Sequence, residues 1–380
     1  MTKAAELAKM GEVLTNNQIG GRRNIVINGA MQVAQRATSV TFNSTGGGYQ
    51  TVDRFRFAGN RDQYVATLSQ ASDSPSGFGH SFKVATTTQE TSLDADNQLN
   101  IQHRLEGQDL QQLKKGTSDA EKLTLSFYVK SSIATTFSVN LVDNDNTRTI
   151  ASTYTVNVAD TWELKTITFA GDTTGALDND NARSLDLKFW LDGGTTYTSG
   201  TLATSWASSN NANNISATTN FMTTANSTWQ ITGIQLEVGS VATPFEHRSF
   251  GEEQALCMRY YQKIADGDEP NSSLVSSAAA QTVANMAAYQ TSSIFGVLDL
   301  AVRMRAYPTI DLTTGTDYYT FLRTGTNDPF NSFSLVRSQH DRLELYAANS
   351  TNGSLSHSQN VAGWMRINDA SAYFAVSAEL

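Results

Sequence analysis

The chain has 380 residues, and at about 150 residues per domain this length predicts two or three domains. Only 17% of the residues are charged, and 27 basic against 36 acidic residues give a net charge of −9. A nucleic-acid backbone is therefore not expected as the main partner, because it is itself a polyanion. A lone cysteine, Cys257, excludes a disulfide within the chain, and we expect it to be a buried structural thiol.

Residues 1–23 are expected to form an anchoring arm. Leu7 and Leu14 belong to an apolar stripe at helical spacing, so a short helix is predicted over 3–14. A helix of about a dozen residues is marginal alone in water, so we expect it to form when docked on another protein. The alternative is a frayed arm. The residues expected to make the anchor are Leu7, Met10, Leu14, Arg22 and Arg23.

Charged residues interrupt this N-terminal segment, so it lacks the apolar core of a signal peptide. No stretch approaches the roughly 20 apolar residues that a membrane helix needs. We therefore expect a protein made in the cytoplasm, with no membrane insertion.

Residues 24–248 show the alternation of apolar and polar residues that is typical of strands with one buried face. Clusters of Asn, Asp and Gly separate these runs, and one short helix is predicted near 109–115. Long helices do not alternate with the strands, so an antiparallel sandwich is expected instead of a parallel α/β sheet. The clearest apolar alternations lie at 123–129, 137–141, 185–191 and 234–238.

Residues 193–236 contain no charged side chain and no histidine. Three interpretations are open: a long ordered loop, strands packed against another copy of the chain, or a disordered linker. Disordered stretches are usually charged and poor in aromatics, whereas this one contains Tyr197 and Trp206, which weighs against the linker.

Residues 249–380 are expected to form a second, smaller β domain. Ser249 and Glu252 have the spacing of a capping box, which predicts a helix start. The fold class is thus all-β, with an arm at 1–23, a β-sandwich at 24–248 and a smaller β-sandwich at 249–380. Neither a 20–50-residue repeat nor sustained heptads are visible. The strands expected in the second domain are 258–264, 297–306, 332–336, 343–347 and 372–380.

No catalytic, cofactor or metal site is predicted. The five histidines lie far apart, and the motifs of a nucleophile elbow or a phosphate loop are missing. Two turns share the sequence Asp-Asn-Asp-Asn, at 143–146 and 178–181. Both are interpreted as plain turns, with a structural Ca²⁺ as the alternative. Paired carboxylates for glycoside hydrolysis cannot be located, because any two of 36 acids can meet in a fold.

Aromatic side chains in polar, turn-like surroundings suggest sugar binding, because sugars stack their apolar C–H faces on aromatic rings. For each such residue the alternative is packing in the core or between subunits. The candidates are Tyr49, Tyr197 and Trp206 in the first β domain, and Tyr318, Tyr319 and Trp364 in the second.

Several segments resemble tail fibres and related minor virion proteins of marine and cyanobacterial phages. They sample the chain from residue 24 to its end, and their order and spacing carry the resemblance. They are NIVINGAMQVAQRAT (24–38), YQTVDRFRFAG (49–59), ADTWELKTITFAGDTTG (159–175), WQITGIQLEVGSVATPFEHR (229–248), CMRYYQK (257–263), FGVLDLAVRMRAYPTIDL (295–312) and DASAYFAVSAEL (369–380).

This resemblance implies a jelly-roll sandwich similar to carbohydrate-binding modules, followed by a smaller β-sandwich, in a subunit that usually forms a homotrimer. It implies attachment of the arm to an adaptor or nozzle protein of the phage tail, and contact of the distal domain with a host-surface glycan. The expected function is therefore that of a non-enzymatic tail fibre. The alternatives are a purely structural virion protein, such as a capsid decoration or tail adaptor, and a glycan hydrolase.

Overall fold

The computed structural model describes residues 3, 23–43, 46–267, 281–323, 326–349 and 355–380. The chain divides into two compact units. Unit 1 runs to Glu253 and includes Leu380, whereas unit 2 comprises Gln254–Glu379. The predicted boundary at 248/249 lies close to this division. The predicted anchoring helix, with Leu7, Met10, Leu14 and Arg22, lies outside the described residues.

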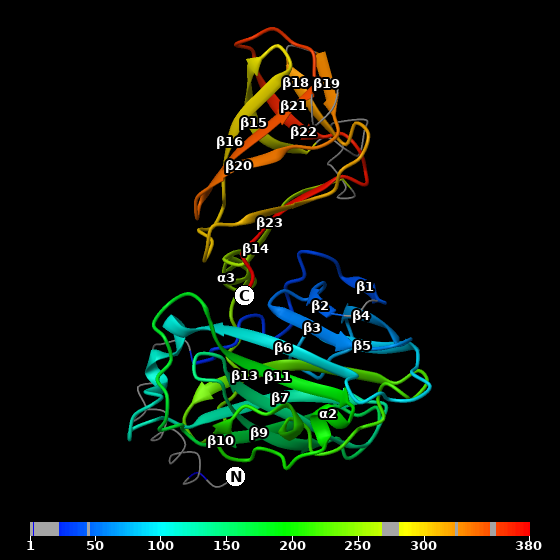
Figure 1. Cartoon of the computed structure of the whole chain (residues 1–380), viewed down its shortest axis with the longest axis vertical. Helices are drawn as coiled ribbons and strands as arrows, with labels where there is room; N and C mark the ends of the chain where they lie inside the picture. Colours follow the sequence, from blue (N-terminus) through cyan, green and yellow to red (C-terminus); the bar gives the residue numbers. More distant parts are fainter. Residues whose placement is uncertain (1–2, 4–22, 44–45, 268–280, 324–325, 350–354) are drawn as a thin grey trace. The chain divides into compact units, whose positions relative to one another are not determined.

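Unit 1 is a sandwich of two sheets in which every described strand pairing is antiparallel (Figure 1). Sheet A has the strand order β1-β4-β5-β13-β7-β10, and sheet B has the order β12-β9-β8-β11-β6-β3-β2. Sheet A consists of β1 (Ser39–Phe42), β4 (Val65–Ala71), β5 (Ser81–Thr88), β7 (Leu123–Ser131), β10 (Glu163–Phe169) and β13 (Thr228–Val238). Sheet B consists of β2 (Gly46–Tyr49), β3 (Phe55–Asn60), β6 (Gln98–Glu106), β8 (Thr136–Asp143), β9 (Arg148–Thr155), β11 (Arg183–Gly193) and β12 (Ala207–Ser208).

The core of unit 1 lies between the two sheets. Strand β7 turns every second residue inward, and β8 and β11 of the opposite sheet do the same. Phe127 and Phe189 meet across this core with ring centroids 5.1 Å apart. Burying one such side chain contributes about 1.5–3 kcal/mol. The period of two in the sequence therefore predicted these strands and their buried faces correctly.

From 194 to 227 the uncharged stretch is an ordered loop within unit 1, the first of the three interpretations, and its residues 228–236 belong to strand β13. It contains α2 (Thr195–Thr198), β12 and the short helix η2 (Asn211–Asn213) before β13 begins. Tyr197 and Ile215 pack on Trp190, which faces away from the main core. The helix predicted near 109–115 is a 3₁₀ helix, η1 (Gly107–Leu113).

Unit 2 contains two further sheets. Sheet C has the order β14-β23-β17, and sheet D has the order β19-β18-β22-β15-β16-β21-β20. Their shared core includes Ala265 and Phe374 of sheet C and Phe321 and Met365 of sheet D. Sheet C consists of β14 (Tyr261–Asp266), β17 (Thr309–Leu312) and β23 (Tyr373–Ser377). Sheet D consists of β15 (Thr282–Gln290), β16 (Ser293–Asp299), β18 (Tyr319–Arg323), β19 (Thr326–Phe330), β20 (Ser334–Ser338), β21 (Arg342–Ala348) and β22 (Ala362–Ile367).

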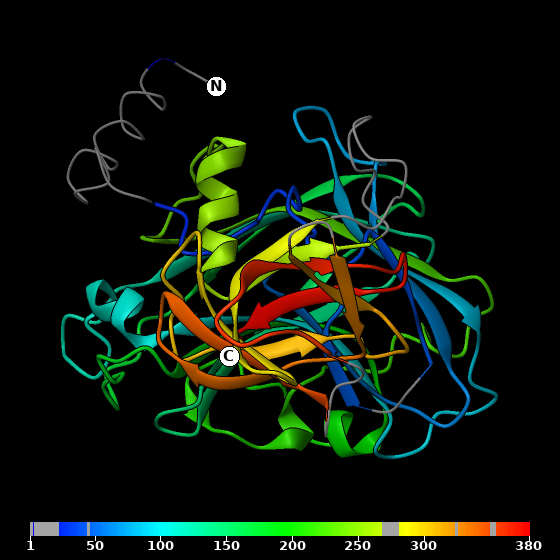
Figure 2. The same ribbon diagram turned by 90° about the horizontal axis from the view of Figure 1, so that it is seen from above.

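The predicted capped helix is α3 (Phe250–Met258), the yellow-green coil in Figure 2. The Ser249 hydroxyl accepts a hydrogen bond from the Glu252 N–H at 3.3 Å, as the capping spacing predicted. Cys257 is fully buried in this helix, as expected. Within the part of the chain that the structure describes, no helix combines the length and the apolar character needed to cross a bilayer.

The strand predicted over 297–306 is wrong in its bounds, because β16 begins at Ser293 and ends at Asp299. Leu300 and Met304 are buried, but their N–H groups donate to carbonyls of the loop at residues 340–341. The alternation of apolar residues therefore extends beyond the end of the strand, into a loop whose apolar side chains are also buried. The predicted all-β class is correct for the described residues, which contain only short helices.

Candidate functional site

A hollow of about 770 Å³ opens on the outer face of sheet A in unit 1. Its lining comes from four segments that are separate in sequence: the loop 76–78, the outward residues of β7, those of β10, and β13 with the following loop 240–247. Because these segments meet only in the folded sandwich, the hollow is a product of the tertiary structure.

A bulge in β13 makes the floor of the hollow. The pairing of β13 with β7 is irregular between Thr232 and Gln235, and Gly233 lies there with φ +62°. A Cβ atom on Gly233 would lie 2.7 Å from the Phe78 ring and 3.2 Å from the Tyr128 ring. Glycine is therefore required here, both for its positive φ and for the close approach of Phe78.

Aromatic rings in the lining of the hollow cluster around Phe78. The Phe78 ring centroid lies 5.5 Å from that of Tyr128, 5.0 Å from that of Phe245 and 5.2 Å from that of His247. None of the four is fully buried, and the neighbouring Leu164 is 57% exposed. The hollow thus offers partly solvated ring surfaces, which can stack on an apolar ligand face.

Hydroxyl groups also line the hollow. Ser126 of β7 and Thr166 of β10 are cross-strand partners, and both belong to the lining. The described lining contains no aspartate, glutamate or cysteine. The site can therefore combine stacking with hydrogen bonds, but it presents no pair of carboxylates for general acid–base chemistry.

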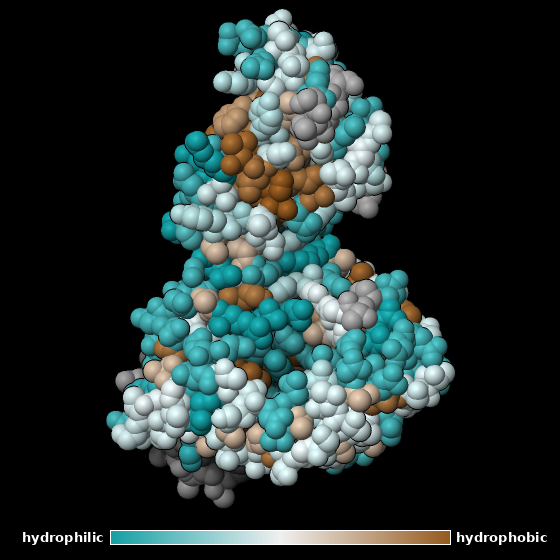
Figure 3. All heavy atoms as spheres, in the orientation of Figure 1, coloured by the Kyte–Doolittle hydropathy of each residue, from teal (hydrophilic) through white to brown (hydrophobic). Residues whose placement is uncertain are grey.

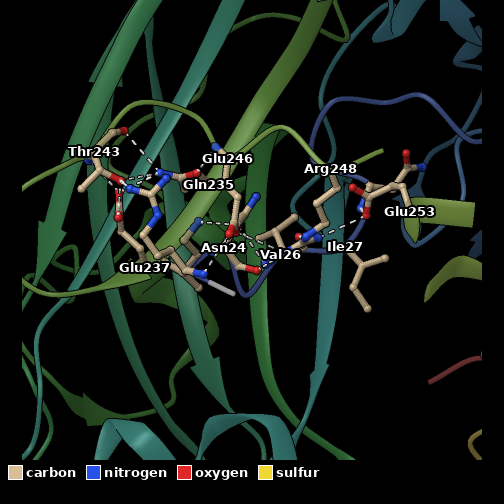
Figure 4. Close-up of polar contacts among 12 residues, drawn as sticks. Asn24, Val26, Ile27, Gln235, Glu237, Thr243, Glu246, Arg248 and Glu253 are labelled. Atoms are coloured by element: carbon tan, nitrogen blue, oxygen red, sulfur yellow. Dashed lines mark hydrogen bonds and ion pairs between the residues drawn. The ribbon is translucent and has the colours of Figure 1, made fainter. Parts of the chain in front are cut away.

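Two buried side chains of β13, Gln235 and Glu237, hold the loop 240–247 over the sheet (Figure 4). The Thr243 N–H and hydroxyl donate to the two oxygens of Glu237, at 2.8 and 2.7 Å. The Glu246 N–H donates to the Gln235 side-chain oxygen at 2.8 Å. The loop is thereby fixed at Thr243 and Glu246, on both sides of Phe245 in the sequence.

The chain that enters unit 1 reinforces this loop (Figure 4). The Asn24 N–H donates to Glu246 at 2.8 Å, and Arg23 donates to the Thr243 hydroxyl at 3.1 Å. The Arg248 guanidinium donates to the carbonyl oxygen of Asn24. The segments 24–38 and 229–248, which carry the sequence resemblance, are therefore neighbours. Arg23, which is expected to belong to the anchor, thus hydrogen-bonds to Thr243 within unit 1.

None of the aromatic residues predicted in the first domain lines the hollow. Tyr49 lies on β2, on the outer face of sheet B. Tyr197 is 9% exposed and packs on Trp190, so its ring is not available as a surface platform, contrary to the expectation. Trp206 is partly buried, and the Lys115 ammonium lies 5.2 Å from its ring centroid.

The three candidates of the second domain are also dispersed. Tyr319 is fully buried, and its hydroxyl donates to the Thr313 carbonyl at 2.8 Å, which corrects its expected place at the surface. Burial raises the pKa of Tyr319 to about 12. Tyr318 packs beside the core of unit 2. Trp364 is 49% exposed, with the Arg366 guanidinium 5.8 Å from its ring.

Sequence reasoning missed the aromatic lining of the hollow. Phe245 and His247 lie within the segment 229–248, which was noted only as one of the segments that resemble tail-fibre proteins. Phe78 follows a serine- and glycine-rich turn. The only available signal was the presence of aromatic residues beside turn residues, and the same signal selected Tyr49 and Tyr197.

The first Asp-Asn-Asp-Asn turn holds a lysine ammonium. Lys115 Nζ lies 2.5 Å from Asp143 and 3.0 Å from Asp172, and the Asn146 N–H also donates to Asp143 at 3.0 Å. In the second turn the Asp178 N–H donates to the Asp145 carboxylate at 2.9 Å, so the two turns contact each other. Within the described ranges no three metal-ligating side chains cluster.

No family model matches this chain, and no curated protein matches its sequence. Solved structures that match include the enzymatically active domain of tailspike protein 4 of bacteriophage CBA120, at 13% identity and TM-score 0.30, covering 57% of this chain and 21% of that one. The family 11 carbohydrate-binding module of a cellulosomal cellulase from Clostridium thermocellum matches at 12% identity and TM-score 0.27, over 55% of this chain and all of the module. A xylan-binding domain from Paenibacillus barcinonensis matches at 13% identity and TM-score 0.26, over 54% and 94%.

The chain thus spans about a fifth of the matched tailspike chain. Because all three TM-scores lie below 0.5, we draw no functional conclusion from these structures. The β-sandwich is established by the strand pairing, and the candidate site is defined by the side chains that line the hollow.

Proposed function

We propose that this chain is a non-enzymatic glycan-binding subunit of a phage virion, and that it serves as a tail fibre. The observation that carries the glycan-binding part is the hollow on sheet A, whose lining combines aromatic rings and hydroxyls. The virion location, the homotrimer and attachment through residues 1–23 rest on the sequence resemblance to tail-fibre proteins.

The geometry suits a sugar. The C–H face of a pyranose ring stacks on the exposed surfaces of Phe245 and Tyr128, while Ser126 and Thr166 hydrogen-bond its hydroxyls. The loop that carries Phe245 is held by Gln235 and Glu237 before the ligand arrives. Little conformational entropy is then lost on binding. Several copies in one particle would raise a weak affinity by about 10²–10⁴-fold through avidity.

Affinity electrophoresis of the purified chain in gels containing neutral polysaccharides tests this proposal. We expect retardation by at least one of a panel of β-glucan, galactan, mannan and xylan. Phe245→Ala should weaken it about tenfold, as expected for a stacking residue. Tyr289→Ala is the matched control, because Tyr289 is 69% exposed and lies in unit 2. Absence of binding to every polymer, or equal binding by Phe245→Ala, would refute the proposal.

Deletion of residues 1–22 tests the attachment. This truncation keeps Arg23 and its hydrogen bond to Thr243, so unit 1 should retain its melting temperature. We expect the truncated chain to fold but to be missing from purified particles. Normal incorporation of the truncated chain would show that the arm is not the anchor.

A purely structural virion protein is the second candidate, and sheet D favours it. Trp364, Val297 and Tyr289 are 49%, 42% and 69% exposed in this sheet, and apolar residues gather on unit 2 where sheet D lies (Figure 3). Exposed apolar surface of this kind often contacts another protein. Under this alternative Trp364→Glu blocks incorporation into particles, and no polysaccharide is bound.

A further inference from the structure

Basic side chains gather on the outer face of sheet B, on the opposite sheet from the hollow. The inward residues of β6 and β11 belong to the core, so the alternate residues face outward. Cross-strand pairing places Arg56 beside Gln102, Gln102 beside Lys188, and Arg104 beside Asp186. We name this surface the basic face, and it consists of Arg56, Gln102, Arg104, Arg183, Asp186 and Lys188.

Positive charge exceeds negative charge on the basic face, although the whole chain carries a net charge of −9. Both Arg183 and Lys188 use the same carboxylate: Arg183 Nε lies 2.7 Å and Lys188 Nζ 3.7 Å from oxygens of Asp186. The backbone of Arg56 pairs with Tyr49 and Gln102, but its guanidinium makes no hydrogen bond or ion pair with a described residue. Glu106, which flanks the face, accepts a hydrogen bond from the Gln108 side chain at 2.6 Å.

The basic side chains are partly withdrawn from water. Lys188 and Arg183 have side chains that are 19% and 33% exposed. Burial is the main cause of the lowered pKa of Lys188, and the positive charges of Arg183 and Arg104 lower it further. An incoming anion would offset this repulsion, and the partial burial would strengthen its attraction.

Amide side chains extend the face along β6. Arg104 Nη2 donates to Gln102 at 3.2 Å, and Gln102 donates to Asn100 at 2.7 Å. Arg104 Nη1 and the Tyr49 hydroxyl both donate to the main-chain oxygen of Leu380. These two donors beside the face therefore already bind an oxygen acceptor. Hydrophilic residues are dense on the front of unit 1, where β6 and β11 lie (Figures 1 and 3).

We propose that the basic face binds a carboxylate-bearing sugar, such as a uronic-acid residue of an acidic polysaccharide. Guanidinium groups pair with carboxylates through charge-assisted hydrogen bonds, and the neighbouring amides suit sugar hydroxyls. A nucleic acid fits less well, because its many phosphates would meet a chain of net charge −9 and the Asp186 carboxylate. This second site does not depend on the hollow of sheet A.

Calorimetric titration of the full chain with oligogalacturonate tests the proposal, with the methyl-esterified oligomer as the uncharged ligand. We expect the acidic oligomer to bind at least tenfold more tightly at low salt, and added NaCl to weaken that binding. Arg56→Gln should reduce the affinity about tenfold, the effect of losing one charge-assisted hydrogen bond. Arg56→Lys should recover part of it, since it keeps the charge.

Two control variants isolate the site. Lys122→Gln removes an exposed lysine elsewhere in unit 1 and should leave oligogalacturonate binding unchanged. Phe245→Ala should also leave it unchanged, so failure at the hollow and failure at the basic face remain distinguishable. The proposal is overturned if the acidic and esterified oligomers bind alike, if neither binds, or if a DNA oligonucleotide binds more tightly. Should Arg56→Gln not fold, the ester comparison and the salt series on the unmutated chain decide the question.

Discussion

Replacement of Lys115 by methionine is the sharpest test of how unit 1 is held together. The Lys115 side chain is 5% exposed, and its ammonium contacts Asp143 and Asp172, which are still more deeply buried. It also donates to the carbonyl oxygens of Thr174 and Gly175, at 3.0 and 2.8 Å. Methionine preserves the apolar stem of the side chain but leaves these acceptors without their donor.

Breaking a buried ion pair by removing one partner costs about 3–5 kcal/mol, because the remaining charge stays desolvated. For a domain of 150–250 residues each kcal/mol lowers the melting temperature by about 2–4 °C. We therefore expect Lys115→Met to lower the melting temperature of unit 1 by about 6–20 °C in differential scanning calorimetry. Lys114→Met is the matched control. Lys114 is 55% exposed, and its ion pair with Glu121 lies in solvent, so little change is expected.

The pH dependence provides an independent check. Burial alone would raise the pKa of Asp172, but hydrogen bonds from Arg148, Lys115 and the Thr174 N–H outweigh it, so the pKa lies below its ordinary value. A depressed folded-state pKa stabilises the fold above the unfolded pKa of about 4, and this contribution is lost as the pH falls through the folded pKa. Lys115→Met removes part of this contribution, so its deficit should be large at pH 7 and smaller at pH 3. A shift under 2 °C at pH 7, or a deficit that grows in acid, would refute the reasoning.

Three further predictions concern the site and the two cores. Gly233→Ala should weaken neutral-polysaccharide binding in affinity electrophoresis, because its Cβ would displace the Phe78 ring; unchanged binding would show that this floor is not used. Burial holds the pKa of His103 well below 6.5. The folded state therefore keeps this histidine neutral, and it loses stability relative to the unfolded chain as the pH falls below 6.5, where the unfolded chain binds the proton. Urea unfolding at pH 7 and 5 should therefore show a smaller acid loss for His103→Asn than for the unmutated chain. In the second unit, Tyr319→Ala should cost about 3–5 kcal/mol in the same assay, whereas Trp364→Ala, at a half-exposed position, should cost far less.

The sequence predicted strands where one residue in two is buried, and it predicted the α3 cap from Ser249 and Glu252. Both signals are local, because pleat and capping geometry involve residues close together in the chain. The strand expected to continue to residue 306 shows the limit of this reasoning. Leu300 and Met304 have the right apolar spacing, but their N–H groups bond to a loop instead of a neighbouring strand.

Two of the aromatic candidates, Tyr197 and Tyr319, are buried for a related reason. Tyr319 and Tyr197 stand beside turn residues in the sequence, and nothing local shows that another segment covers them. Phe78 and Phe245 look similar in the sequence, yet their rings lie 5.0 Å apart at the surface of sheet A. Whether a ring is exposed depends on which other segments fold against it, and spacing alone cannot reveal this.

The amino-acid sequence alone thus determined the all-β class, the acidic net charge and the position of the strands with the clearest apolar alternation, because period, composition and capping are properties of short segments. Only the tertiary structure decided which side chains meet. It placed the loop 240–247 over sheet A through Gln235 and Glu237, and it aligned Arg56, Gln102 and Lys188 across three strands. Strand order and register set these neighbours, and both are fixed by long-range pairing.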